Sequence, residues 1–396
     1  MKKWLHLWRK RPYWLWITLV FLALFTLYTI HLTTHWTPPR EAIPLSGIDF
    51  PVYWYGVIIV GGIGLGAYVV SQLAQDRARV LFNEQVPLAV QNLPLAVLAL
   101  PEEMTSLLAK QGDTLGVVLF QWGIEPRMLG LNREGLTLFY ERATAVPGVQ
   151  PQWLDDPAWR VWSPELVWNG LVWVMVLGVI GARLYHVLTP SPSMAAFGIH
   201  SPADYFRNPA MLINLRNGGL GIYGGIAGGA LGLALFAWRK RLPGLAWADL
   251  TTVGLALGQA IGRWGNFFNQ ELYGRPTNLP WAVYIDPNNR LTGFREFETF
   301  HPAFLYESLW NLLTFGLLYT LANRYADRMR AGEMTAVYLI MYAIGRTLLE
   351  TVRLDSRTMT IGGLDIQLAI ATVVSIAIAI TMALWMAWRR ARAGKS

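Results

Sequence analysis

The stretch Tyr13–Ile30, YWLWITLVFLALFTLYTI, indicates the fold class of this chain. It contains no Asp, Glu, Lys or Arg, and as a helix it is long enough to span a hydrocarbon layer of about 30 Å. The whole chain has the same character, because 54% of its 396 residues are hydrophobic and 15% are charged. In soluble proteins, on average, about 45–50% of the residues are hydrophobic and about 25% are charged. The sequence therefore predicts a membrane protein.

Seven further charge-poor runs follow this first one. They are Val52–Gln75, Leu166–Ala182, Asn217–Trp238, Leu250–Gly262, Ser308–Asn323, Met334–Gly345 and Ile366–Trp388. Each run predicts one membrane helix, so we expect an all-α polytopic membrane protein with eight helices. The first helix is preceded by basic residues but followed by no small-residue cleavage site, which favours an uncleaved signal anchor.

The positions of Lys and Arg predict how these helices are oriented. The two termini and the loops on their side carry fifteen such residues, whereas the short loops on the opposite side carry eight. Because positive residues accumulate on the cytoplasmic side of a membrane, we expect both termini in the cytoplasm. The basic clusters are thus explained as topology signals, and no nucleic-acid binding is expected.

One long polar segment interrupts the pattern between about Val80 and Ser163, where proline residues recur between short helical pieces such as Glu102–Lys110. We expect a cytoplasmic insertion at about 80–163. The predicted organisation is a signal-anchor helix with an outer linker at 1–48 and a core at 49–396 that contains this insertion. The chain has no Cys, which excludes a disulfide scaffold, a thiolate metal site and a cysteine nucleophile. No metal site and no cofactor are expected.

A glycine-rich motif, NGGLGIYGG at Asn217–Gly225, opens the fourth predicted helix. Gly224 and Gly228 are four residues apart, a spacing that lets helices approach closely in a membrane. Packing therefore explains most of these glycines. It does not explain Tyr223, whose phenol is placed among glycines at the outer end of the helix, and Tyr223 is a candidate site residue.

The motif GRWGNFFNQELYGRPT, at Gly262–Thr277, is the densest polar cluster that directly follows a predicted helix. Charged residues at membrane depth are costly, so Arg263 and Glu271 are functional candidates. Arg263 and Asn266 are three residues apart on one helical face, where a guanidinium and an amide can reach the same anion. The alternative is an Arg263–Glu271 ion pair that stabilises a helix break.

Three charged residues of the next motif, Arg346, Glu350 and Arg353, are spaced i, i+4 and i+7 on one predicted helix face. Two arginines around one carboxylate leave a positive charge suited to phosphate, and the alternative is a self-neutralised ladder. Arg183, after the third predicted helix, is expected to be an anchor whose guanidinium reaches the membrane surface. The segment HPAFLYE, His301–Glu307, favours capping and anchoring as much as chemistry.

Taken together, these motifs resemble those of the prolipoprotein diacylglyceryl transferase family. The resemblance rests on Trp54-Tyr55-Gly56, GARL at Gly181–Leu184, NGGLGIYGG, GRWGNFFNQELYGR, HPAFLYE, and GRTLLETVR at Gly345–Arg353. It extends from about Val52 to the end of the chain, without the insertion. It implies a seven-helix transferase core, to which this chain adds one extra amino-terminal transmembrane helix.

The resemblance also implies an activity. The family transfers the diacylglyceryl group of phosphatidylglycerol to the lipobox cysteine thiol of secreted prolipoproteins, releases glycerol phosphate, and so begins lipoprotein maturation. The substrate brings the thiol, which agrees with the absence of Cys here. The implied partners are phosphatidylglycerol, the lipobox segment and the lipid bilayer, and the implied location is the bacterial cytoplasmic (inner) membrane.

The resemblance assigns roles to individual residues. Arg263 and Arg346 correspond to the family's two essential arginines, with Arg263 on the lipid head group. The other implied site residues are Asn266, Glu271, Gly274 and Tyr55, with Glu350 and Arg353 beside them.

The group that accepts the thiol proton stays open at this point. Family members have His or Tyr at the position of Tyr223, and a phenol is ordinarily a weak base at neutral pH. Glu271 is therefore a rival to Tyr223 as the base.

A transporter or flippase for an anionic lipid or solute is the alternative function. Such a protein could use the same intramembrane arginines to bind its substrate. Transporters often contain internal repeats, and the Arg263 and Arg346 motifs share little beyond Gly-Arg.

Overall fold

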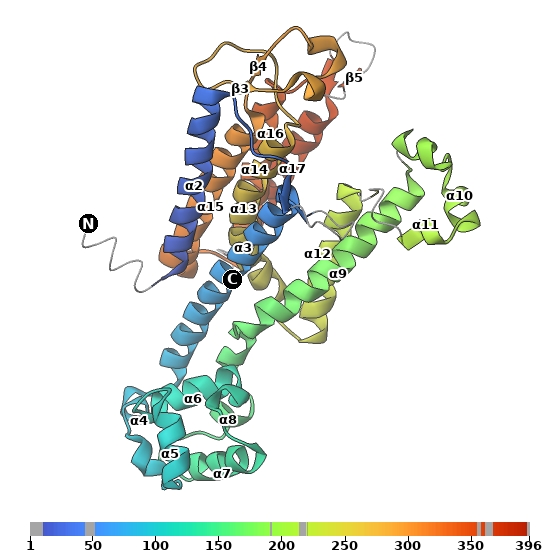
Figure 1. Ribbon diagram of the computed structural model, residues 1–396. Coiled ribbons are helices and arrows are strands. Elements are labelled where there is room, and N and C mark those ends of the chain that lie inside the picture. The colour runs from blue at the N-terminus through green and yellow to red at the C-terminus, as the bar shows by residue number, and fades with distance from the viewer. Residues whose placement is uncertain are drawn as a thin grey trace. The chain divides into compact units, whose positions relative to one another are not determined.

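The computed structural model describes residues 11–43, 52–190, 192–213, 219, 221–354, 358–360 and 367–393. The basic residues before Arg11, and Asn217 and Gly218 of the glycine motif, lie outside these residues. The described chain is predominantly helical and divides into two compact units (Figure 1). The first unit is Met1–Val70 with Leu245–Ser396, and the second is Ser71–Gly244.

Eight long helices occur where the charge-poor runs predicted them. They are α2 (Tyr13–Thr34), α3 (Trp54–Gln85), α9 (Glu165–Leu188), α12 (Ile222–Arg239), α13 (Gly244–Gly262), α15 (Ala303–Arg324), α16 (Glu333–Glu350) and α17 (Ile370–Ala393). Among the described residues, α2, α3, α9 and the Ala371–Arg392 part of α17 are long and apolar enough to cross a membrane by length and composition alone. The predicted all-α polytopic fold class is confirmed.

The first unit adds short elements to its long helices. They are β1 (Glu41–Ile43), β2 (Val52–Tyr53), α14 (Trp264–Asn269), β3 (Val283–Tyr284), η5 (Pro287–Asn289), η6 (Thr292–Phe294), β4 (Thr299–Phe300), η7 (Ala326–Arg328), β5 (Thr358–Thr360) and β6 (Gln367–Ala369). The strands form three antiparallel pairs, β1 with β2, β3 with β4 and β5 with β6. None of these pairs was predicted from the sequence, because two or three residues carry no readable period.

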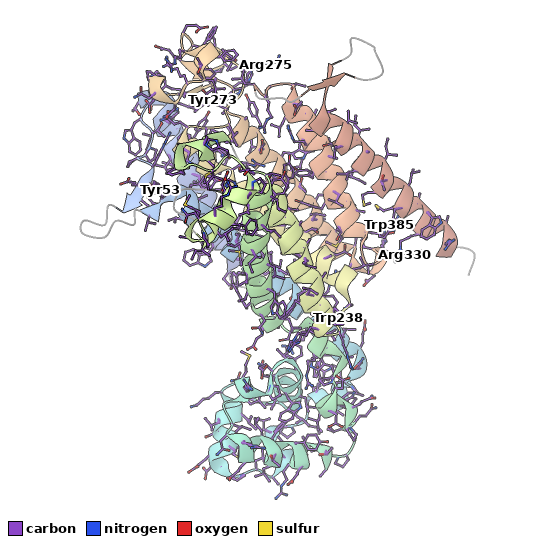
Figure 2. All side chains as sticks on the ribbon, turned by 90° about the vertical axis from the view of Figure 1, so that its right-hand side faces the viewer. Tyr53, Trp238, Tyr273, Arg275, Arg330 and Trp385 are labelled. Atoms are coloured by element: carbon purple, nitrogen blue, oxygen red, sulfur yellow. The ribbon has the colours of Figure 1, made fainter. Side chains whose placement is uncertain are left out.

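A buried carboxylate fixes the beginning of α16 in the first unit. Asp249 of α13 accepts hydrogen bonds from the backbone N–H of Gly332 at 2.7 Å and of Thr335 at 2.8 Å. It thus supplies the side-chain cap that Gly332, the N-cap residue of α16, cannot provide. At the same end of the helix, the Arg330 guanidinium donates to the Arg389 carbonyl of α17, near Trp385 (Figure 2).

A cluster of buried, mostly aromatic residues packs around the short helix α14. Its buried members are Leu24, Tyr28, Trp264, Phe267, Phe268, Tyr273, Val283, Ile285, Phe300, Phe304 and Leu305. They come from α2, α14, α15 and the connection between α14 and α15. The extra helix α2 therefore packs into the core of the first unit.

Two helices of the second unit, α9 and α12, pack at backbone contact distance. A Cβ atom at Gly181 would lie 2.3 Å from the carbonyl oxygen of Gly224, and one at Gly224 would lie 2.1 Å from that of Gly181. Only glycine fits such a contact. The packing role predicted for the glycines of this motif is confirmed.

The remaining short helices of the second unit lie mostly in the insertion. They are α4 (Leu88–Gln91), η1 (Leu95–Leu98), α5 (Glu102–Ala109), α6 (Leu115–Ile124), η2 (Pro126–Leu129), α7 (Arg133–Thr144), α8 (Gln152–Asp155), η3 (Ala158–Trp162), η4 (Pro192–Phe197), α10 (Pro202–Arg207) and α11 (Ala210–Ile213). The helical piece predicted at Glu102 is confirmed by α5. The insertion has its own aromatic core, in which Phe82 of α3 lies edge-on to Phe120 at 5.4 Å and to Trp159 at 5.0 Å.

Candidate active site

Arg263 lies at the junction of two helices, directly after α13 and at the N-cap position of α14. Its guanidinium Nε forms an ion pair with the Glu307 carboxylate of α15. Glu307 is only 7% exposed. A buried carboxylate needs a cationic partner, so the pair fixes the position of the arginine. The Arg263–Glu271 pair considered from the sequence is wrong, because Glu307 is the partner.

The same carboxylate also faces a second arginine. Nη1 of Arg353 lies 3.8 Å from Oε1 of Glu307. Arg353 follows the end of α16 at Glu350, where the chain turns away from the helix axis. Its guanidinium thus contacts Glu307 of another helix, and the three-residue ladder predicted along one face is wrong at its third member.

The first two members of that ladder do pair. Arg346 and Glu350 form an i, i+4 ion pair on α16, with side chains 22% and 10% exposed. Neither Glu350 oxygen has a hydrogen-bond partner of suitable geometry among the described residues. The first unit thus holds two ionic groups, Arg263 and Arg353 around Glu307 and separately Arg346 with Glu350. The side chains of the two groups, together called the arginine cluster, have a net charge of one positive unit. A negatively charged ligand can balance that charge.

Glu271 lies in a different environment. Its Oε1 accepts hydrogen bonds from the side-chain amides of Asn266 at 3.0 Å and Asn269 at 3.1 Å. Asn266 is 6% exposed, whereas Glu271 is exposed. The turn that carries Glu271 has left-handed residues on both sides, Gln270 with φ 51° and Leu272 with φ 52°. Asn266 therefore holds the carboxylate of this turn through its side-chain amide.

Gly274 lies where three motifs meet. Its backbone N–H donates to the His301 carbonyl at 2.8 Å, and the next N–H, of Arg275, donates to the Val352 carbonyl at 2.8 Å. A Cβ atom at Gly274 would lie 2.7 Å from that same carbonyl oxygen. The glycine thus allows the segment after α14, the beginning of α15 and the end of α16 to join. Tyr273 and Arg275 mark this segment in Figure 2. Burial raises the pKa of Tyr273, whose hydroxyl donates to the Asn289 carbonyl.

Tyr55 reaches α14 from the first turn of α3. A Cβ atom at Gly265 would lie 2.6 Å from Cδ2 of Tyr55, so the phenol ring rests directly on the α14 backbone. Tyr55 thus lies beside the helix that carries Asn266. The first unit therefore contains all but one of the predicted site residues, namely Tyr55, Arg263, Asn266, Glu271, Gly274, Arg346, Glu350 and Arg353.

Tyr223 belongs to the second unit. It lies in the first turn of α12, is 69% exposed, and has its ring centroid 5.8 Å from that of Tyr185 on α9. Its phenol is therefore accessible within the second unit.

The sequence missed two residues of importance. Glu307, within HPAFLYE, is the carboxylate that links two arginines. Arg183 is 8% exposed and donates to the carbonyls of Leu212 and Gly219, both at 2.8 Å. Its predicted role as a membrane-surface anchor is wrong, because these carbonyls enclose the guanidinium. The signal available for Glu307 was its charge inside an apolar helix, which requires a cationic partner.

The α10 helix that precedes the glycine motif is capped by Asp204. Hydrogen bonds from the backbone of His200 and from Ser201, together with the Arg207 guanidinium at 2.8 Å, lower the pKa of Asp204. The carboxylate is therefore ionised at neutral pH. The ionised carboxylate stabilises the amino-terminal cap of α10, the helix that precedes Leu212, whose carbonyl accepts from Arg183.

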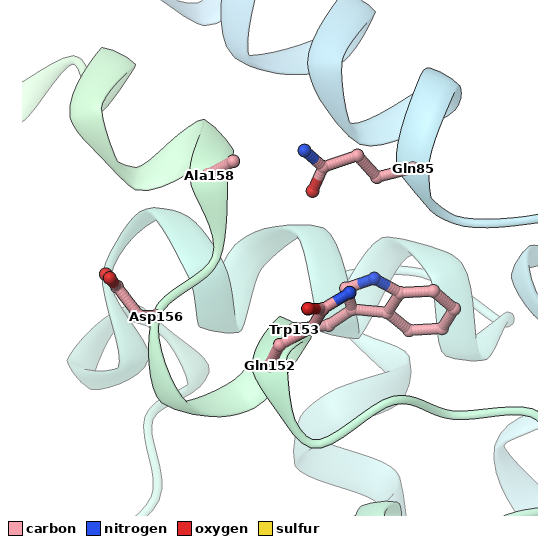
Figure 3. Close-up of a pocket in the computed structure, with 5 residues that line it drawn as sticks. All are labelled: Gln85, Gln152, Trp153, Asp156 and Ala158. Carbon is pink, nitrogen blue, oxygen red and sulfur yellow. The ribbon is translucent and has the colours of Figure 1, made fainter.

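The insertion has an open pocket of its own, of about 280 Å³ (Figure 3). It is lined by Gln85, Gln152, Trp153, Asp156 and Ala158. None of these is a predicted site residue, and none is a cation. The pocket therefore offers no positive charge to a phosphate, in contrast to the arginine cluster.

Comparison with known proteins assigns the chain to a family. Residues 145–388, more than half of the chain, match the family described as prolipoprotein diacylglyceryl transferase. The chain belongs to this family. The matched residues include Tyr223, Arg263, Glu307, Arg346 and Arg353, whereas α2 lies outside them. As a member of a transferase family with several apolar helices, the chain is a multi-pass membrane transferase.

Individual diacylglyceryl transferases support this assignment. The enzyme named phosphatidylglycerol–prolipoprotein diacylglyceryl transferase of Trichormus variabilis is 42% identical over 197 residues, 49% of this chain and 66% of that protein. Its namesake in Nostoc sp. is 39% identical over 231 residues, 58% of this chain and 77% of that protein. The one in Fervidobacterium nodosum is 41% identical over 234 residues, which are 59% of this chain and 74% of that protein. The chain thus spans about two thirds to three quarters of the length of these relatives.

Proposed function

We propose that this protein transfers the diacylglyceryl group of phosphatidylglycerol to the lipobox cysteine of prolipoproteins. The observation that carries the proposal is the arginine cluster of the first unit, in which Arg263 and Arg353 share Glu307 while Arg346 pairs with Glu350. Its net positive charge complements the single negative charge of a phosphodiester. Arg263 is 33% exposed and Arg346 is 22% exposed, so each has room to donate further hydrogen bonds.

The proposed reaction is a displacement at carbon. The thiolate sulfur forms a bond to the glycerol carbon that carries the phosphate ester, and the bond between that carbon and the ester oxygen breaks. The electron pair stays on the oxygen, which leaves as glycerol phosphate. Negative charge grows on this leaving group, and Arg263 and Arg346 stabilise it. The thiol proton passes to a base, for which Tyr223 and Glu271 are the two candidates.

Each candidate base has a distinct environment. Tyr223 is open to solvent in its own unit. Glu271 already accepts two amide hydrogen bonds on one oxygen, which leaves its second oxygen for a thiol. The remaining proposed roles are those of Asn266, Gly274 and Tyr55 in shaping the lipid site.

The proposed location is the bacterial cytoplasmic (inner) membrane, with both termini and the insertion in the cytoplasm. The excess of Lys and Arg on that side supports it. In this orientation the Arg263 end of α13 faces outward, where a translocated precursor presents its cysteine.

The test uses the purified full-length protein, phosphatidylglycerol vesicles and a lipobox peptide. We expect the peptide to gain the mass of one diacylglyceryl group in mass spectrometry. Arg263→Ala should abolish this product, because it removes a charge-assisted contact to the phosphate. Arg295→Ala, at an exposed arginine of the connection between α14 and α15, is the matched control and should retain activity.

Two results would contradict the proposal. One is near-normal turnover by Arg263→Ala. The other is phosphatidylglycerol translocation across the vesicle membrane without any modified peptide, which would favour a flippase.

A further inference from the structure

The helix α2 that precedes the family core has one buried face along its entire length. Its buried residues are Tyr13, Ile17, Phe21, Leu24, Tyr28 and His31, each 7% exposed or less. The opposite face is exposed, with Leu19 at 45% and Leu22 at 61%. A helix that only tethers a protein to a membrane does not need such a face, so α2 is an integral helix of the first unit.

The carboxyl-terminal half of α2 packs against the aromatic residues of α14. The Tyr28 ring lies 5.7 Å from that of Phe267 and 6.1 Å from that of Trp264, edge to face in both pairs. Phe25 also meets Trp264, at 5.3 Å. With six residues, α14 is too short to be stable alone. Its position therefore depends on what packs behind it.

A hydrogen bond connects the chain neighbours of the two partners of the Arg263–Glu307 ion pair, and one of these neighbours, Trp264, is held by α2. Trp264 directly follows Arg263, and its indole N–H donates to the Ser308 hydroxyl at 3.0 Å. Ser308 in turn directly follows Glu307. A shift of the Trp264 ring would therefore be passed to both partners of the pair.

Two hydrogen bonds join α2 to the connection between α14 and α15. The Tyr28 hydroxyl donates to the Trp281 carbonyl at 2.8 Å. The backbone N–H of Tyr284 in β3 donates to Nε2 of His31 at 3.1 Å. Since β3 pairs with β4, and β4 leads directly into α15, α2 also supports the segment that carries Glu307.

We propose that Tyr28 and His31 are positioning residues of the transferase, which hold α14 and the connection to α15 so that Arg263 and Asn266 are placed to bind the phosphatidylglycerol phosphate. The proposal rests on the proposed function. It makes α2 a part of the lipid site of this chain, although α2 lies outside the residues that match the family.

The experiment compares two tyrosines of the same helix face. Tyr13 and Tyr28 are 0% and 4% exposed, and both hydroxyls are hydrogen-bonded. They are fifteen residues apart, about 22 Å along the helix, and Tyr13 contacts Tyr319 on α15. Tyr28→Leu and Tyr13→Leu in the full-length protein should therefore destabilise the fold similarly, while only the first disturbs α14.

The decisive readout is the KM for each substrate. Tyr28→Leu should raise the KM for phosphatidylglycerol by about tenfold, because misplaced binding groups weaken binding of the lipid. The KM for the lipobox peptide should stay within twofold. Tyr13→Leu should leave both KM values within twofold of those of the unaltered protein. Tyr28→Phe keeps the ring and should restore most of the lipid affinity.

A second pair of variants keeps the test valid should Tyr28→Leu not fold. In His31→Gln the amide oxygen can still accept the Tyr284 N–H, whereas His31→Leu cannot accept it. We expect a raised lipid KM only in the leucine variant.

Equal KM values in the Tyr28 and Tyr13 variants, with activity that only follows melting temperature, would overturn the proposal. An unaltered protein that forms no lipidated peptide would instead contradict the proposed function.

Discussion

At the scale of single residues, Glu307 is the group on which the arginine cluster depends. It is buried, it pairs with Arg263, and it faces Arg353 at 3.8 Å. A carboxylate between two guanidinium groups fixes their directions and limits their mutual repulsion. A phosphate site built from these arginines therefore depends on Glu307 as well as on the arginines themselves.

This dependence makes Glu307→Gln an informative substitution. The amide keeps the shape but loses the charge, so Arg263 is no longer held by an ion pair. We expect kcat/KM of the transfer reaction to fall by at least about tenfold, the equivalent of one charged hydrogen bond. The lipobox peptide assay with phosphatidylglycerol measures it.

Glu333→Gln is the matched control. Glu333 is 0% exposed and accepts two hydrogen bonds from Arg390, at 2.9 and 2.7 Å, at the opposite end of α16 from Arg346. Its loss should lower the melting temperature without raising the KM for the lipid. If both variants lose activity in the same proportion as stability, Glu307 has no special part in the site.

The identity of the base is also decided at this scale. Tyr223→Phe keeps the ring and removes the only proton acceptor of that side chain. If Tyr223 accepts the thiol proton, the single-turnover rate at saturating phosphatidylglycerol should fall by roughly 100-fold or more, the lower end of general-base contributions. If it only orients a substrate, the loss should be nearer tenfold, about one hydrogen bond.

Glu271→Gln tests the rival base under the same conditions. The amide keeps the size of the side chain but is a poor proton acceptor. A large loss in this variant, with Tyr223→Phe within threefold of the unaltered protein, would assign the role to Glu271.

The sequence identified the arginines of the candidate site and the partner of Arg346, but not the partner of Arg263. Spacing shows which residues share a helical face, and the i, i+4 pair of Arg346 and Glu350 followed from it. It does not show which other helix lies opposite. Arg263 and Glu307 are on different helices, so their pairing depends on how α14 and α15 pack, and Arg183 meets carbonyl groups that no side-chain pattern reveals.

At the scale of elements, the α9–α12 contact distinguishes two adjacent glycines of α12. A Cβ atom at Gly224 would collide with the Gly181 carbonyl oxygen at 2.1 Å. One at Gly225 would meet the Ala182 methyl at 3.6 Å, an ordinary contact. The two positions therefore differ in packing although they are adjacent in the sequence.

Gly224→Ala should thus destabilise the protein, whereas Gly225→Ala should not. The first has to separate the helices, at a cost of about 1–3 kcal/mol. The second gains helix propensity and should be neutral or stabilising by about 0.4–1 kcal/mol. Thermal unfolding of both variants in the same detergent measures the difference. Equal effects would mean that the helices do not touch at Gly224.

Long elements were predictable from the sequence and short ones were not. Charge-poor runs predicted the eight long helices of the described residues, because a membrane helix needs a long apolar segment. The strands of two or three residues and the six-residue helix α14 depend on tertiary contacts. For α14 these include Tyr28 of α2, a helix predicted as a simple anchor.

At the scale of the whole molecule, the site residues are divided between the two units. The groups proposed to bind the lipid phosphate all belong to the first unit, whereas Tyr223 belongs to the second. A substitution that only displaces the lipid-binding groups, such as Tyr28→Leu in the first unit, should accordingly act on lipid binding. Tyr223→Phe in the second unit should act on the rate of the bound complex.

The insertion is the part of the chain whose role in the reaction is easiest to test. It was predicted at about 80–163, and in the structure α3 continues to Gln85 and α9 begins at Glu165. The segment between these two helices carries none of the predicted site residues. Its interior is closed by its own aromatic rings, including Phe120 and Trp159, which pack around Phe82 of α3. A clean deletion must therefore also replace the side chain of Phe82.

We expect a variant that lacks residues 86–163, with a short Gly/Ser bridge and Phe82→Gln, to retain most of its transfer activity. The reason is that the lipid-binding groups lie in the first unit, while the insertion folds around its own core. The glutamine prevents the exposed ring from causing aggregation, and Phe82→Gln alone in the full-length chain is the control for damage within the insertion. The assay is mass spectrometry of the lipobox peptide, with melting temperature measured in parallel. A deletion variant that melts normally but forms no product would show that the insertion takes part in the reaction.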